Sequence, residues 1–369
     1  MHIRALAVNR NRDYRGKYVS KAQLSALRRR LLAWYRRSAR DLPWRRTGDA
    51  YRIWVSEVML QQTQAATVVP YFERFISAFP TVEELARAPQ QRVLKLWEGL
   101  GYYSRARNLH TAAALVVRQR CGRLPTSAAD WQTLPGVGRY TAAAIASIAY
   151  GEPVAVLDGN VARVLARLLA LGNPIDAPAT RAALWEEAQR LLAPQAPGDF
   201  NQAMMELGAR VCTPRNPSCG ACPLRRHCLA AARGIADELP VKRARPAVPH
   251  VRAAAAAIEC DGRYLLVRRP QRGLLAGLWQ LPTVEVNQRA AARELREHVR
   301  SRLAYQIRVG PLVATIRHQF THRLLDVSVY RCVCAHATHH SVDTRWLTPA
   351  RFGSLPMSVL DRKLAACLV

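Results

Sequence analysis

Four cysteines lie within seventeen residues of one another, at Cys212, Cys219, Cys222 and Cys228. Thiols so close along the chain must face one small volume, and a site with four thiolate ligands is closed and structural by default. The chain has nine cysteines in all, and this odd number favours metal ligation over a disulfide framework. The spacing alone leaves a zinc ion and an iron–sulfur cluster both open, although it contains only one CxxC. The segment 212–228 therefore predicts a metal centre.

The charge of the chain indicates its partner. Fifty-five Lys and Arg against twenty-six Asp and Glu give a net charge of +29, spread over the whole length. Such a balance favours a polyanion such as DNA, although Arg that only keeps a protein soluble, or a basic subunit of an assembly, is the alternative. No apolar run is long enough for a membrane span, and the start lacks the apolar stretch of a secretory signal. We expect a cytoplasmic protein with no membrane partner.

The hydropathy pattern divides the 369 residues into two domains. Apolar residues recur at helical spacing through the first two-thirds, which predicts a mainly α domain over 18–232. Residues 233–249 contain three prolines among basic residues and are typical of an extended linker. Four β-like runs and a helix follow, so an α+β domain is expected over 250–369. The expected helices are 21–37, 51–64, 82–87, 106–120, 140–150, 161–171, 181–192 and 288–303, and the expected strands are 255–259, 264–268, 307–315 and 325–333.

Glu57 lies in a helical segment, Ile53-Trp-Val-Ser-Glu57-Val-Met-Leu60, that is apolar nearly all round. The segment should be buried, and an unpaired carboxylate is costly there. Burial would raise the pKa of Glu57 and leave it able to act as a general acid near neutral pH. The alternative is an ion pair with a buried arginine, either Arg45 or Arg46.

Asp158 follows an apolar run and precedes the helix that begins near Val161. It is well placed to be an N-cap, and that structural role alone would explain it. The helix N-terminus would also favour the ionised carboxylate. A neutral acid and an anion together suit cleavage of a glycosidic bond, in which the acid protonates the leaving base and the anion stabilises a cationic sugar.

Gly136 and Gly138 form a turn, Leu134-Pro-Gly-Val-Gly138, before the helix at Tyr140. Backbone N–H groups of such a turn, at a helix N-terminus, bind phosphate without a side chain. A plain helix–turn–helix connection is the alternative.

The stretch LPGVGRYTAAAIASIAYG, followed by VAVLDGNVARVLAR, resembles the helix-hairpin-helix-GPD superfamily of DNA glycosylases. Endonuclease III-like members, which also nick the strand, have a Schiff-base lysine at position 140, whereas this chain has Tyr140. With WVSEVMLQQTQ, the tyrosine makes the chain similar to the MutY family of adenine glycosylases. The resemblance implies base removal without strand cleavage, and a 4Fe–4S cluster on the four cysteines. Some relatives have lysine where this chain has Ala162, which puts covalent trapping in doubt but not excision.

The resemblance also implies roles for matching residues. Glu57 would protonate adenine, Asp158 would stabilise or briefly bond to the sugar cation, and Tyr140 and Asn160 would orient them. A side chain that intercalates into the duplex as a wedge would fill the gap left by an extruded base. Ordinary core packing would also explain Leu100 and Tyr102. The implied pocket residues are Trp44 and Arg45, and the implied wedge residues are Gln62, Thr63, Leu100 and Tyr102.

The C-terminal segments GLLAGLWQLP and HQFTH look like the MutY C-terminal domain, which has the Nudix hydrolase fold. Only a fragment of the Glu-rich metal box is present, at 293–297, so nucleotide hydrolysis is not expected. By resemblance, Phe320, Thr321 and His322 read 8-oxoguanine opposite the adenine. Many relatives have serine at 321, and a solvated strand end is the alternative.

These observations predict a helix-hairpin-helix glycosylase domain joined to a Nudix-like domain, acting as a monomer in base excision repair. The expected partner is double-stranded DNA with an adenine:8-oxoguanine or adenine:guanine mispair, bound in the nucleoid. The rival interpretations are an endonuclease III-like lyase, a non-catalytic iron–sulfur DNA-binding or redox protein, and a Nudix hydrolase.

Overall fold

The computed structural model describes residues 20–244, 246–287, 290–334 and 341–368. The predicted domain start at 18 and the predicted helix start at 288 lie outside these residues. The chain divides into two compact units, one of residues 1–61 and 120–245 and the other of residues 62–119 and 246–369. The predicted helical domain therefore contributes to both units. None of the described helices is long and apolar enough to cross a membrane.

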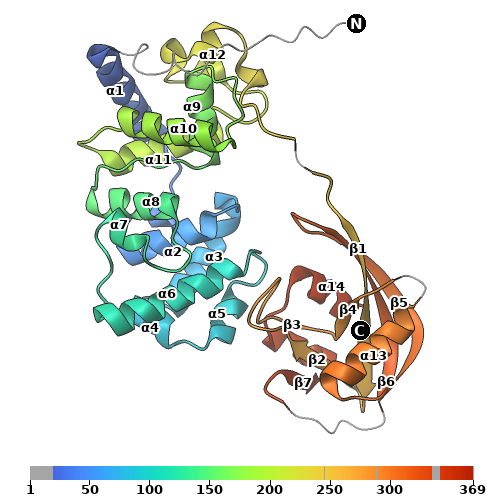
Figure 1. The fold of residues 1–369 in the computed structure, drawn as a ribbon. Coiled ribbons are helices and arrows are strands. Elements are labelled where there is room, and N and C mark those ends of the chain that lie inside the picture. Colours follow the sequence, from blue (N-terminus) through green and yellow to red (C-terminus); the bar gives the residue numbers. More distant parts are fainter. Residues whose placement is uncertain (1–19, 245, 288–289, 335–340, 369) are drawn as a thin grey trace, which may run out of the picture. The chain divides into compact units, whose positions relative to one another are not determined.

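The first unit is entirely helical among its described residues (Figure 1). Its longer helices pack around one apolar core, which contains Leu31, Leu165 and Phe200. Its helices are α1 (Lys21–Ser38), η1 (Pro43–Arg45), α2 (Ala50–Leu60), α7 (Ala128–Trp131), α8 (Arg139–Tyr150), α9 (Gly159–Leu168), α10 (Pro178–Leu191), α11 (Pro197–Arg210), η2 (Cys219–Ala221), η3 (Arg225–His227), α12 (Leu229–Ala232) and η4 (Ala236–Glu238).

Polar side chains begin the helices that matter for the site. Ser20 and Gln23 form a capping box at α1, and Asp49 caps α2 by accepting from the amides of Tyr51 and Arg52. Such caps satisfy amides that have no partner within a helix. The expected helix 51–64 is shorter than predicted, because α2 ends at Leu60 and Gln62 follows with a left-handed φ of 59°.

The second unit combines four helices from the middle of the chain with a C-terminal part built on a mixed sheet. Residues 62–119 supply the helices, and Pro70 lies within the first of them. These are α3 (Ala65–Ala78), α4 (Val82–Arg87), α5 (Gln90–Leu96) and α6 (Ser104–Arg120). The C-terminal part comprises β1 (His250–Cys260), β2 (Arg263–Arg268), β3 (Trp279–Gln280), β4 (Thr283–Glu285), α13 (Ala291–Leu303), β5 (Ile307–Gln319), β6 (Leu324–Cys334), β7 (Thr344–Leu347), η5 (Pro349–Ser354) and α14 (Val359–Ala366).

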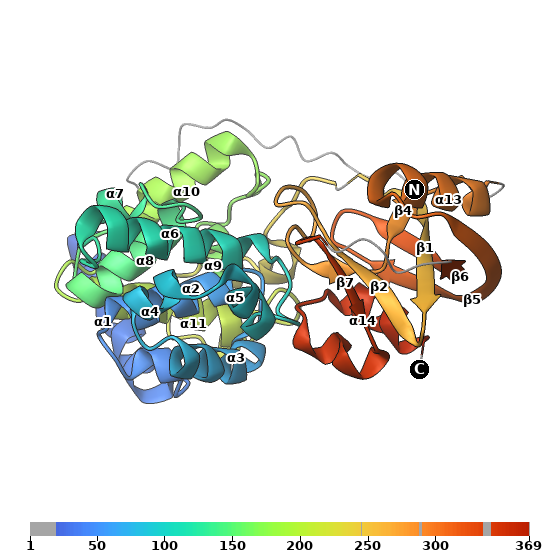
Figure 2. The same ribbon diagram turned by 90° about the horizontal axis from the view of Figure 1, so that it is seen from below.

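The sheet has the order β3-β2-β1-β6-β5, with β4 also paired to β1 and β7 to β2. β1 and β6 run parallel, whereas β5 and β6 form an antiparallel pair. Alternate residues of β1 enter different cores: Ala255 packs with Leu360 of α14, and Ala256 packs with Leu295 of α13. Figure 2 shows these helices on opposite sides of the sheet. Both faces of β1 are therefore covered, which explains its run of apolar residues.

Candidate active site and iron–sulfur loop

Glu57 is a buried carboxyl on α2 of the first unit. Its side chain accepts a hydrogen bond from the Tyr140 hydroxyl at 2.7 Å, and the residue is 4% exposed. Burial raises its pKa to about 7, and the negative charge of Asp158 adds to the rise, while Tyr140 and Arg45 oppose it. The predicted upward shift is confirmed. The alternative ion pair is not formed, because Arg45 binds Glu206 at 2.9 Å and Arg46 binds Asp41.

Tyr140 stands in the first turn of α8, which packs against α2. Burial raises its pKa well above the usual value, as do the charges of Glu57 and Asp158. The hydroxyl therefore stays protonated and donates, either to Glu57 or to the Met205 sulfur 3.1 Å away. A neutral donor at this position orients the Glu57 carboxyl.

Asp158 is the N-cap of α9 and accepts from the amide of Val161 at 2.7 Å and from the side chain of Asn160 at 3.0 Å. The predicted cap is confirmed. The donors at the helix N-terminus lower the pKa of Asp158, as expected, but the expected net bias toward the charged form is wrong, because burial raises the pKa by more than the donors from Val161 and Asn160 lower it. Asp158 still has more N–H donors than Glu57, so of the two carboxyls it is better suited to carry a charge.

Asn160 lies in the first turn of α9 and faces Gly208 of α11. Its amide oxygen accepts from Arg163 at 2.9 Å, and the same guanidinium donates to the carbonyl oxygens of Gly208 and Cys212. A Cβ on Gly208 would lie only 2.6 Å from the Asn160 Cβ, so α11 approaches this closely because residue 208 is glycine. One arginine thus connects the Asp158 cap to the start of the cysteine loop.

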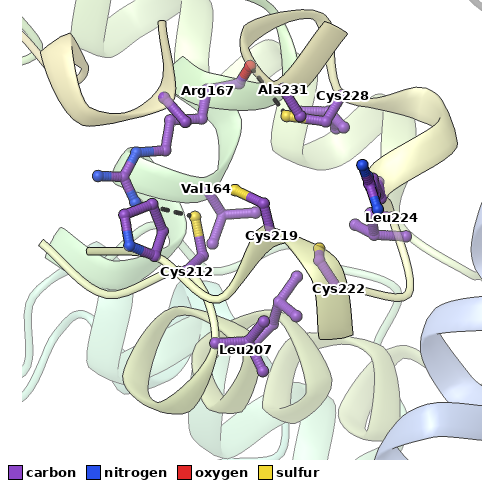
Figure 3. Close-up of a pocket in the computed structure, with 14 residues that line it drawn as sticks. Val164, Arg167, Leu207, Cys212, Cys219, Cys222, Leu224, Cys228 and Ala231 are labelled. Carbon is purple, nitrogen blue, oxygen red and sulfur yellow. Dashed lines mark hydrogen bonds between the residues drawn. The ribbon is translucent and has the colours of Figure 1, made fainter. Parts of the chain in front are cut away.

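The four loop cysteines line one cavity beside α9 and α11. Figure 3 shows their thiols turned toward the same space, among apolar side chains such as Val164 and Leu207. None of the four forms a disulfide. Arg167, which is 1% exposed, donates to the Cys212 sulfur and to the carbonyl of Thr213, and its own carbonyl accepts from Cys228. The loop is therefore anchored on the helix that Asp158 caps.

The arrangement fits an iron–sulfur cluster better than a single ion. Among the described residues, no three His, Cys, Asp or Glu side chains are placed to hold one metal ion. A zinc ion would require all four sulfurs to converge on one point, at ~2.3 Å from the ion. The thiols instead surround a larger volume. Four thiolates in an apolar cavity are the usual ligands of a 4Fe–4S cluster.

The Gly136–Gly138 turn leads directly into α8. Gly136 has a φ of 77°, and Gly138 is the N-cap of α8, where no side chain bonds to the first amides. These N–H groups suit an anion such as a phosphate. Arg139 is directed elsewhere, since its guanidinium lies 4.0 Å from the centre of the Trp185 ring.

The predicted pocket residues lie in η1, which packs against α2. Trp44 is buried, and the Arg45 side chain is 13% exposed. The positive charge of Arg45 reaches Glu57, whose pKa it lowers. This places η1 beside the acid.

The predicted wedge residues lie in two loops of the second unit. Gln62 and Tyr102 are exposed and have left-handed φ values of 59° and 46°, which non-glycine residues rarely adopt and which mark functional sites. Leu100 differs, because it is 6% exposed and packs in the interior. Buried Arg105 joins the loops by donating to the Thr63 hydroxyl at 3.2 Å and to the Leu100 carbonyl.

The 320–323 turn connects β5 to β6, and the Phe320 amide bonds to the Arg323 carbonyl across it. Thr321 and His322 are exposed, and Phe320 is partly buried between the rings of His318 and His322. Within the same unit, the hydroxyls of Thr321 and Tyr102 lie 2.7 Å apart. The structure thus brings the predicted reader and one predicted wedge residue together.

Four buried charged residues of the site were not predicted: Arg105, Arg163, Arg167 and Glu206. Each lies in a helix and bonds to residues distant in sequence. The available signal was a charge within a helical apolar pattern, as in Asn201-Gln-Ala-Met-Met-Glu206-Leu-Gly208, the same signal that indicates Glu57.

The chain matches three family models in separate segments. Residues 55–190 match the HhH-GPD superfamily base excision DNA repair protein, residues 212–228 the iron–sulfur binding domain of endonuclease III, and residues 253–367 the NUDIX domain. Together with the buried acid, the capped aspartate and the cysteine loop, these matches define an iron–sulfur DNA N-glycosylase of the helix-hairpin-helix class.

The particular family follows from relatives that match the chain over most of its length. The chain is 38% identical to the adenine DNA glycosylase of Homo sapiens, over 93% of this chain and 74% of that protein. It is also 38% identical to the adenine DNA glycosylase of Mus musculus, over 93% and 78%. The chain belongs to the adenine DNA glycosylase family of base excision repair, as the sequence motifs predicted. The endonuclease III-like, redox and Nudix hydrolase interpretations give way to this one.

Solved structures agree on the helical part. A thermostable thymine-DNA glycosylase matches with a TM-score of 0.52 and 30% identity, over 57% of this chain and 97% of that one. Endonuclease III in a non-covalent DNA complex matches with a TM-score of 0.51 and 21% identity, over 59% and 99%, and supports the fold alone.

Proposed function

We propose that this glycosylase removes adenine mispaired with 8-oxoguanine or guanine, with Glu57 as general acid and Asp158 as the group that stabilises the sugar cation. The observation that carries the proposal is the pair of carboxyls around Tyr140. Glu57 is buried and has a pKa of about 7, so an appreciable fraction is protonated near neutral pH. Asp158 accepts hydrogen bonds from an amide and from Asn160.

The reaction then proceeds in two steps. The Glu57 carboxyl donates its proton to the extruded adenine, the bond between base and sugar breaks, and the bonding electron pair leaves with the base. The Asp158 carboxylate stabilises the cationic sugar until water adds to it and loses a proton. Tyr140 donates to Glu57 and Asn160 donates to Asp158, and these bonds orient both carboxyls.

The chemistry is proposed to stop at base removal. A lyase needs an amine to form an imine with the opened sugar. Position 140 holds a phenol whose pKa is raised, and position 162 is a buried alanine. Neither group can form that imine.

Recognition of the opposing base is assigned to the 320–323 turn. Thr321 offers a hydroxyl that is exposed and already paired with the Tyr102 hydroxyl. A hydroxyl both donates and accepts, so it can bond to a purine edge while Tyr102 fills space in the duplex.

The test is single-turnover excision from duplexes with adenine opposite 8-oxoguanine, guanine, cytosine or thymine. We expect 8-oxoguanine and guanine to support the fastest excision. Glu57→Gln should lower the rate by about 10²–10⁴-fold, the usual contribution of a general acid, with duplex affinity within about threefold of wild type. Excision by Glu57→Gln at the wild-type rate would refute the acid, and equal rates for all four opposing bases would refute the specificity. Borohydride trapping on abasic DNA should give no covalent product.

A further inference from the structure

Glu206 is a buried carboxyl that the proposed mechanism does not use. It lies on α11, is 0% exposed, and binds two guanidinium groups. Arg40 donates to both of its oxygens, at 2.8 and 2.7 Å, and Arg45 donates at 2.9 Å. A third arginine, Arg210, lies 3.8 Å away. Burial acts to raise the pKa of Glu206, but the hydrogen bonds from Arg40 and Arg45 outweigh it and hold the pKa at about 2.

Arg45 is fully committed in this arrangement. One terminal nitrogen binds Glu206, the other donates to the Arg40 carbonyl at 3.1 Å, and the guanidinium lies over the Tyr35 ring. The same side chain acts electrostatically on Glu57. An arginine in this place with no carboxylate of its own would be drawn to Glu57, and an ion pair there would keep the acid ionised.

We propose that Glu206 is a positioning residue that holds Arg45 away from Glu57 and so keeps the general acid protonated. This inference rests on the proposed role of Glu57 and assigns a supporting role to a second carboxyl, that of Glu206. The bidentate hydrogen bond from Arg40 fixes the position of the Glu206 carboxylate, and this carboxylate in turn fixes the position of the Arg45 guanidinium. Glu206 thus keeps the positive charge of Arg45, a predicted pocket residue, apart from Glu57, which must stay neutral.

The charged and titratable groups that act on Glu57 are few. They are Tyr140 from α8, Asp158 at the start of α9, and Arg45 from η1. The raised pKa keeps Tyr140 neutral, and arginine keeps its charge. The alkaline limb of the pH–rate profile, where the acid loses its proton, therefore reports on Glu57 and its neighbour Asp158.

The experiment measures single-turnover excision of adenine opposite 8-oxoguanine between about pH 5 and 9, with the cluster-loaded protein. Glu206→Gln should move the alkaline limb down by about one unit, so that the rate above the limb falls about tenfold. Its acid plateau should change much less. Glu206→Asp, which retains the charge, should restore the limb. Glu187→Gln is the matched control, because Glu187 pairs with neighbouring Arg190 on α10, and its limb should match wild type.

A second substitution separates positioning from simple loss of charge. With Arg45→Met added to Glu206→Gln, the arginine that acts on Glu57 is removed, so the limb should return toward the wild-type position. A limb that stays shifted in the double variant, or that never shifts in Glu206→Gln, overturns the inference. If Glu206→Gln folds poorly, the double variant Glu206→Gln with Arg40→Met is used instead. It also removes Arg40, the other arginine that loses its partner, and its alkaline limb must show the same downward shift. Failure of the proposed function can be distinguished from failure of this inference, because Glu57→Gln would stay active only in the first case.

Discussion

At the scale of single residues, burial sets the ionisation states that the chemistry needs. Glu57 and Asp158 are both buried, and burial raises both pKa values. They differ in their hydrogen bonds, because Asp158 has an amide and Asn160 as donors whereas Glu57 has Tyr140. The proposed acid, Glu57, is therefore distinguished from the proposed anion, Asp158, by its hydrogen-bond donors and not by burial alone.

The raised pKa of Glu57 predicts a pH-dependent cost in stability. The folded state holds the proton up to about pH 7, whereas an unperturbed glutamate loses it near pH 4.5. The free energy of unfolding should therefore fall as the pH rises between these values, by about 3 kcal/mol in total. Gln cannot ionise, so Glu57→Gln should be more stable than wild type by up to about 3 kcal/mol above pH 7, with the difference vanishing below pH ~4.5. Urea unfolding at a series of pH values checks this, and a difference independent of pH would contradict it.

At the scale of elements, three helices hold the acid, the cap and the cysteine loop in place. α8 carries Tyr140, α9 begins at Asp158, and α11 packs against both. Their close approach depends on a glycine, because α11 lies against Asn160 at Gly208. The position of Asn160 is thus a consequence of helix packing.

Gly208→Ala tests this packing. Alanine normally stabilises a helix interior by about 1 kcal/mol relative to glycine. Here the added Cβ would lie 2.6 Å from the Asn160 Cβ and 3.0 Å from its carbonyl oxygen, so we expect a loss of about 1–3 kcal/mol. Excision should slow because Asn160 moves with the backbone. Gly353→Ala, where nothing lies within 4 Å of the new atom, is the control in thermal unfolding. A stabilised Gly208→Ala would refute the account.

At the scale of the whole molecule, the cysteine loop belongs to one of two compact units. Residues 212–228 pack on α9 and on Leu207 of α11, all within the unit that contains Glu57 and Asp158. Arg167 and Arg163 bond to this loop from α9. Loss of the cluster should therefore affect the active site, while the sheet of the other unit retains its own two cores.

Cys222→Ala tests this division. With one ligand missing, we expect the iron content to fall and the first unit to lose several kcal/mol, because metal binding free energy contributes directly to folding. Amide hydrogen exchange should rise in α9 and α11 and stay unchanged in β1 and β6. Cys121→Ala is the control, since Cys121 is exposed and outside the loop. Equal loss of protection in both units would show that the loop stabilises the whole chain.

Much of this protein follows from local pattern. Helical spacing predicted α1, α8 and α9 to within a few residues, and β-like runs predicted parts of β1, β2, β5 and β6. Helices α3, α5 and α11 were not predicted, because Pro70 interrupts the first and charges fall within the periodic pattern of the last. The short strands β3, β4 and β7 have too few residues to show a period and exist through pairing with β1 and β2.

The sequence by itself determined the chemistry available: four thiols in one loop, an acid in an apolar helix, an aspartate at a helix start and a tyrosine where a lyase needs an amine. The first three features depend on neighbours along the chain, and the role of the tyrosine is implied by the family resemblance, so all four can be found without a fold. The partners of charged groups are different. Tertiary packing paired Arg45 with Glu206 and left Glu57 to Tyr140, because burial and contacts between distant helices decide which charges meet.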